Sequence, residues 1–231
     1  EVALPWDDGW FEGDPAQYNH DLTIAAMVLS GSAYAGRGAG VREGLQRLGF
    51  RAVQSFNYQI CDQPDGGRAA YTFARRDLPD ACLVAVVVRG TGEVTEWAGN
   101  LNVGTGRDHA GFAQAGDELL ENLENYLAQE PDRPLRFLVT GHSRGGAVAN
   151  LTAARLTAEN RGAVYARTFA APAVSLDGTG EGYENIFNIT GPEDLVPQLP
   201  LAQWGYCRYG VDLPLPDRAS WGRAYGSVFQ E

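Results

Sequence analysis

The sequence contains no lysine, and all 18 of its basic residues are arginine. Several kinds of functional site need the lysine ammonium group. They include the Walker A phosphate loop, the Schiff base of pyridoxal phosphate or of a lysine aldolase, and the serine–lysine dyad. The absence of lysine therefore excludes each of these chemistries from the chain.

Cysteine and histidine are scarce. The chain has three residues of each type: Cys61, Cys82, Cys207, His20, His109 and His142. They show neither the C-x-x-C spacing of a redox motif nor the close ligand spacing of a zinc site. We therefore expect no metal site and no cofactor.

Long apolar runs are also missing. The longest, Cys82–Val88, has the length of a strand, whereas about 20 residues are needed to cross a bilayer. A net charge of −11 argues against a nucleic-acid partner and against attraction to anionic membranes. The chain begins with Glu1 and its one methionine is Met27, so we expect a removed leader or a fragment. No signal peptide remains to indicate a compartment.

The 231 residues, 44% of them apolar, suit one domain with a sizeable core. Apolar residues at helical spacing predict helices at Tyr18–Ala35, Val41–Leu48, Ala113–Ala128 and Gly145–Ala158. Apolar runs predict strands at Phe50–Tyr58, Ala70–Arg75, Cys82–Val88, Leu135–Thr140, Val164–Phe169 and Ile186–Ile189. From Leu201 onward no element is clear. Buried strands alternating with helices predict an α/β fold, with a mostly parallel sheet covered on both faces.

The segment "FLVTGHSRGGAVA" places a serine between a predicted strand and a predicted helix. Gly141 to Gly145 fit the pattern G-x-S-x-G, in which a sharp turn exposes a nucleophilic serine, here Ser143. The following helix would direct its N–H groups and the positive end of its dipole toward that serine. A glycine turn whose hydroxyl caps the helix would give the same pattern.

Two further segments fit acyl-transfer chemistry. The strand "VAVVV" ends in Arg89-Gly90-Thr91-Gly92, and Thr91 could donate its N–H and its hydroxyl to an oxyanion. An ordinary strand-ending turn is the alternative, and a dinucleotide fingerprint fails because position 95 is threonine. Downstream, "GPEDLVPQLP" places Asp194 after a strand, where it could orient a histidine or simply form a turn.

Taken together, these segments resemble the class 3 lipases, the fungal-lipase-like branch of the α/β-hydrolases. The resemblance rests on "VVVRGT", "HAGF", "VTGHSRGGAVANLTA", "YARTFAAPAV" and "DLVPQLP", which occur in the family's order over about residues 82–200. It implies a single α/β-hydrolase domain that hydrolyses carboxylic esters, acylglycerols or phospholipids among them. It also implies Ser143 as nucleophile, Asp194 as triad acid, and Thr91 with the Arg144 amide as oxyanion hole.

The chain departs from the family pattern at two places. Arg144 stands where the family commonly has leucine, although an oxyanion hole would use only the backbone N–H of this residue. The stretch from Arg89 to His109, where the family's lipases carry a lid helix, is short and rich in glycine. This composition argues against an extensive lid.

The catalytic histidine of the family follows the aspartate, and no histidine follows Asp194 in this sequence. His142 precedes the serine on a strand and should point away from it. His109 lies in a packing segment and His20 at the head of a helix. We therefore expect the catalytic histidine beyond residue 231. The alternative is an inactive hydrolase-fold domain that binds or scaffolds.

Overall fold

In the computed structural model, the residues described are 4–60, 68–91, 107–129, 133–200 and 202–217. They form one sheet with the strand order β1-β2-β3-β4-β5-β6-β7. The strands are β1 (Arg51–Phe56), β2 (Ala70–Asp77), β3 (Cys82–Arg89), β4 (Leu135–His142), β5 (Ala163–Phe169), β6 (Ile186–Thr190) and β7 (Val211–Pro214). The first three pair antiparallel, and β3 to β7 pair in parallel.

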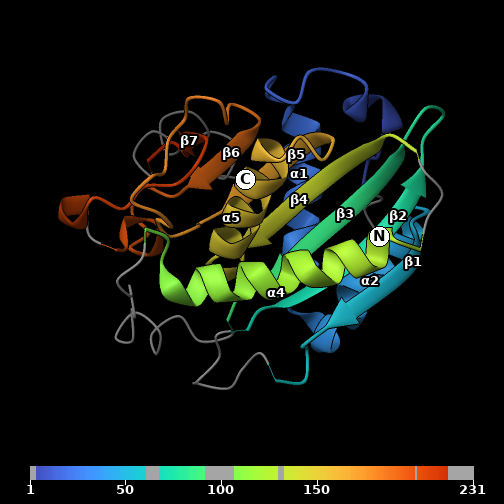
Figure 1. The fold of residues 1–231 in the computed structure, drawn as a ribbon, viewed down its shortest axis with the longest axis horizontal. Helices are drawn as coiled ribbons and strands as arrows, with labels where there is room; N and C mark the ends of the chain where they lie inside the picture. The colour runs from blue at the N-terminus through green and yellow to red at the C-terminus, as the bar shows by residue number, and fades with distance from the viewer. Residues whose placement is uncertain (1–3, 61–67, 92–106, 130–132, 201, 218–231) are drawn as a thin grey trace, which may run out of the picture.

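Helices cover both faces of the sheet (Figure 1). They are α1 (His20–Ser32), α2 (Ala39–Arg47), α4 (Ala110–Leu127) and α5 (Arg144–Ala158). Val84, Val86 and Val88 of β3 lie in the core on the α4 and α5 side, which Figure 1 shows in front of the sheet. Their neighbours Leu83, Ala85 and Val87 lie in the core on the α1 and α2 side. Burial on both faces explains why the run is apolar throughout.

The parallel register brings the ends of the central strands together. Val88 of β3 pairs with Gly141 of β4, which pairs with Thr168 of β5. The segments that follow these strands therefore meet at the carboxyl ends of the strands, where open α/β sheets place their binding sites.

The predicted helices and strands are present, with shifted ends. Helix α1 begins at His20 rather than Tyr18, because the side chain of Asn19 accepts a hydrogen bond from the Leu22 N–H at 2.9 Å and caps the helix. Helix α4 begins at Ala110, three residues before the predicted start. None of the described helices is long and apolar enough to cross a membrane.

The expectation of no clear element after Leu201 is wrong. Strand β7 pairs in parallel with β6 at the edge of the sheet, with Asn188 opposite Asp212. It is only four residues long, none of its side chains is fully buried, and it ends in Pro214. Such a strand gives little sequence signal, and an edge position tolerates proline.

Candidate active site

Ser143 is the single residue between β4 and α5, and its backbone is strained. Its φ of 56° and ψ of −131° lie in a region that residues other than glycine rarely adopt. The Ser143 N–H donates to the Phe169 carbonyl at 2.8 Å, and the Ser143 carbonyl accepts from the Ala147 N–H at 3.1 Å. These bonds fix the turn at the end of two neighbouring strands.

The Ser143 side chain does not cap helix α5. The residue is 1% exposed, and its Oγ bonds none of the described residues. The alternative of a helix-capping hydroxyl is therefore wrong. Because leaving a buried hydroxyl unbonded costs about 1–3 kcal/mol, an unbonded serine on a strained turn indicates a functional role.

The turn packs against β3 so closely that only glycine fits. A Cβ atom on Gly145 would lie 2.5 Å from the Val88 carbonyl oxygen and 2.6 Å from the Arg89 carbonyl carbon. On the β3 side, a Cβ atom on Gly90 would overlap the Tyr34 hydroxyl and would lie 3.3 Å from the Ser143 Cβ. The backbone after β3 is thus directly beside the serine.

This contact brings Thr91 to the elbow. The Thr91 hydroxyl is buried and bonds none of the described residues, as is true of the Ser143 hydroxyl. Arg144 contributes the first backbone N–H of α5, at the positive end of the helix dipole. The Arg144 side chain extends toward β2, where its Nη1 donates to the Arg68 carbonyl at 2.9 Å.

His142 points toward α1 rather than toward the serine. Its Nδ1 lies 2.9 Å from the Tyr34 hydroxyl. Burial raises the pKa of Tyr34 to about 12, against the opposing Arg89 charge, so the phenol stays protonated. Burial lowers the pKa of His142, although the charge of Asp194 acts in the opposite direction.

His142 and Tyr34 line an apolar cavity of about 290 Å³ between α1 and the sheet. The other lining residues are Met27, Ser30, Gly31 and Phe169.

Asp194 follows β6, at the same carboxyl ends of the parallel strands. One of its carboxylate oxygens, Oδ1, accepts from the Val196 N–H at 2.9 Å. The side chain is half-buried, and its charge acts on His142 at the elbow. The turn that bears Asp194 is therefore close enough to His142 for its charge to act on that ring.

None of the three histidines bonds Ser143 or Asp194 among the described residues. His109 is 4% exposed at the start of α4, and its ring stacks on Phe112 with centroids 4.1 Å apart. Burial, and then the charge of Arg144, lowers the pKa of His109. His20 is exposed and lies beside Tyr18. The glycine-rich segment expected to form a poor lid falls mainly on residues 92–106, outside the described part of the chain.

A mostly parallel sheet with a strained serine between a central strand and the next helix defines an α/β-hydrolase. The family described as "Lipase (class 3)" matches residues 85–204, more than half of the chain, so the chain belongs to that family. Solved structures agree on the fold. The triacylglyceride lipase of Rhizomucor miehei is 21% identical with a TM-score of 0.58, covering 86% of this chain and 79% of that one. The Lip2 lipase of Yarrowia lipolytica is 19% identical with a TM-score of 0.62, covering 84% and 77%.

Curated relatives include the secreted mono- and diacylglycerol lipase 1 of Fusarium solani, 32% identical over 53% of this chain and 41% of that protein. The secreted mono- and diacylglycerol lipase A of Penicillium cyclopium is 29% identical over 61% of this chain and 54% of that protein. The chain thus spans about half the length, or less, of these relatives.

Two contacts of the site had no signal in the sequence. Tyr34 bonds a residue 108 positions away, and Arg208, described below, reaches carbonyls in two separate segments. Neither residue belongs to a motif, so a single sequence offers no means of finding them.

The close contact between the turn and β3 predicts that Gly145→Ala destabilises the fold by about 1–3 kcal/mol, because the new methyl group meets backbone atoms that cannot rotate away. Chemical denaturation would measure the free energy of unfolding. Gly116→Ala on α4 is the matched control, since no atom lies within 4 Å of an added Cβ there and alanine favours the helix. Equal effects of the two substitutions would contradict the packing argument.

Proposed function

We propose that this protein is a serine carboxylic-ester hydrolase that acts through an acyl-enzyme on Ser143. The observation that most supports the proposal is the strained Ser143, whose buried, unbonded hydroxyl lies beside the Gly90–Thr91 turn. The names of the curated relatives favour mono- and diacylglycerols as the ester class. A single α/β-hydrolase domain is part of the proposal, because both cores pack on one sheet.

In the proposed reaction, Ser143 Oγ attacks the ester carbonyl carbon while a base accepts its proton. The Thr91 N–H and hydroxyl and the Arg144 N–H donate to the oxyanion of the tetrahedral intermediate, which collapses as the charged base gives its proton to the departing alcohol oxygen. Water then releases the acid from Ser143 by the same steps. Asp194 orients the base and stabilises its charged form.

We propose that the base is a histidine beyond residue 231. This part of the proposal is supported by the described positions of His20, His109 and His142, none of which bonds the serine or the aspartate. A carboxylate alone is a poor base for an alcohol at neutral pH. The proposed imidazole would bond Ser143 with one ring nitrogen and Asp194 with the other.

We expect Ser143→Ala to lower the turnover of a soluble p-nitrophenyl ester at least about 10³-fold, because the acyl-enzyme route is lost. The parent, as the full-length protein, should label with a fluorophosphonate probe, and the variant should not. A parent that neither labels nor turns over the ester would support the inactive binding or scaffold domain instead. Turnover in Ser143→Ala within a few-fold of the parent would assign the chemistry to another residue.

Thr91→Val should lower kcat roughly 10²-fold to 10³-fold, because it removes one oxyanion donor and keeps the backbone N–H. Thr152→Val is the matched control, since among the described residues this buried hydroxyl on α5 bonds only the Val148 carbonyl of its own helix. If both variants keep the parental kcat, the oxyanion site must lie elsewhere.

His109→Phe should keep esterase activity within a few-fold and make stability less dependent on pH. Burial lowers the His109 pKa, so below the ordinary imidazole value of about 6.5 the unfolded chain binds the extra proton first. Above about pH 6.5, the contribution of the neutral His109 ring to the free energy of unfolding is complete. This contribution is lost as the pH falls from there through the pKa of His109 in the folded protein. The slope of Tm against pH below 6.5 should therefore be shallower in the variant. A loss of activity by several orders of magnitude would instead identify His109 as the base.

A further inference from the structure

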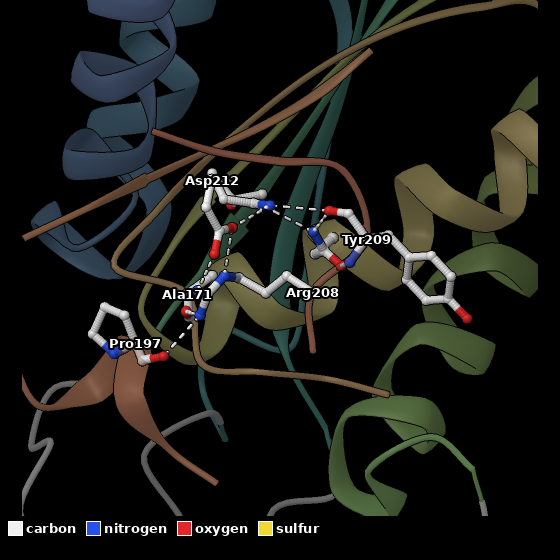
Figure 2. Close-up of polar contacts among 8 residues, drawn as sticks. Ala171, Pro197, Arg208, Tyr209 and Asp212 are labelled. Carbon is white, nitrogen blue, oxygen red and sulfur yellow. Dashed lines mark hydrogen bonds and ion pairs between the residues drawn. The ribbon is translucent and has the colours of Figure 1, made fainter. Parts of the chain in front are cut away.

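Arg208, in the segment before β7, has a partly buried guanidinium that bonds two parts of the chain. Its side chain is 12% exposed. The Nη1 atom donates to the Ala171 carbonyl at 3.0 Å and to the Pro197 carbonyl at 2.8 Å (Figure 2). Ala171 follows β5, whereas Pro197 follows β6, so a single nitrogen holds both segments.

The Pro197 carbonyl belongs to the turn that bears Asp194. The 3-10 helix η3 (Val196–Gln198) begins two residues after Asp194. Its first N–H, that of Val196, donates to the Asp194 carboxylate, and the Gln198 side chain donates to the Asp194 carbonyl at 3.2 Å. A displacement of η3 would therefore move the carboxylate with it.

The Ala171 carbonyl belongs to the segment that supports the serine elbow. The Phe169 carbonyl, two residues earlier, accepts the Ser143 N–H at 2.8 Å. The Ala173 N–H donates to the Leu199 carbonyl at 2.7 Å, so this segment also contacts the chain just after η3. Arg208 thus ties the aspartate turn to the backbone that holds the serine.

Asp212 of β7 fixes the guanidinium in this orientation. Its Oδ1 accepts from the Arg208 Nε at 2.9 Å, and its Oδ2 accepts from Nη2 (Figure 2). Asn188 of β6 also donates to Asp212 Oδ1, at 3.1 Å. The planar guanidinium donates to a carboxylate on one side and to two carbonyls on the other. A lysine ammonium cannot reproduce this arrangement.

We propose that Arg208 is a positioning residue that holds Asp194 in place relative to Ser143. It acts through the η3 turn and does not touch the reacting atoms. The inference rests on the proposed function, because the consequence for activity requires Asp194 to orient the catalytic base.

The test compares the full-length parent with Arg208→Gln and Arg208→Lys on one soluble ester. Arg136→Gln is the matched control. Arg136 is 17% exposed and bonds both oxygens of Asp80 at 2.8 Å, at the other end of the sheet. The control therefore removes a similar arginine–aspartate pair and should keep the parental kcat.

For Arg208→Gln we expect kcat to fall about tenfold or more, with KM within twofold of the parent. The acid limb of the kcat/KM profile should move to lower pH, because a displaced Asp194 no longer raises the pKa of the base. Arg208→Lys should recover part of kcat. A parental kcat and an unmoved acid limb in Arg208→Gln would overturn the proposal. The proposal would also be overturned if Arg136→Gln lowered kcat as much as Arg208→Gln does while lowering Tm by the same amount.

Amide hydrogen exchange at Val196 tests the clamp without turnover. The exchange should be faster in Arg208→Gln than in the parent or in Arg136→Gln, because the turn is no longer held at Pro197. Unchanged exchange would reject the clamp. A parent that does not hydrolyse the ester would reject the proposed function and this role of Arg208 together, and the exchange result would show whether the clamp itself exists.

Discussion

The whole site depends on one backbone contact, the packing of the turn around Ser143 against the end of β3. Gly145 lies directly on the carbonyls of Val88 and Arg89, and Gly90 lies against the serine from the other side. No side chain could be placed between these segments. The contact has two consequences: it holds the serine in its strained conformation, and it brings the Gly90–Thr91 turn beside the serine.

The titratable rings near this contact are neutral, although the charges of Arg89, Arg144 and Asp194 act on them. Burial lowers the pKa of both His109 and His142, so both rings are mainly neutral near pH 7, and the Tyr34 phenol remains protonated. The hydroxyl oxygens of Ser143 and Thr91 are themselves buried. In such surroundings a hydrogen bond to a developing oxyanion contributes more than it would in water.

The sequence predicted the sheet well because burial on both faces of β3, β4 and β5 leaves continuous apolar runs, which need no tertiary information to be found. It also indicated the serine turn, because close packing there demands glycine at Gly141 and Gly145. The roles assigned to Ser143, Asp194, Thr91 and Arg144 stay predictions, although the fold brings their segments together at the carboxyl ends of the parallel strands. Strand β7 could not be predicted, because its pairing depends on partners in β6 and not on a pattern of its own.

That unpredicted strand bears on the position of Asp194. Asp194 lies in a turn whose position cannot be fixed by its own four or five residues, since a short 3-10 helix has few internal hydrogen bonds. The turn needs outside support, and part of it comes from Arg208, which is oriented by Asp212 of β7. The Ala173 N–H also bonds the chain after η3, at the Leu199 carbonyl. In our proposal, a segment without a motif thus helps to decide where a motif residue lies. The placement of Asp194 then depends on β7 as well as on the local hydrogen bonds within "DLVPQLP".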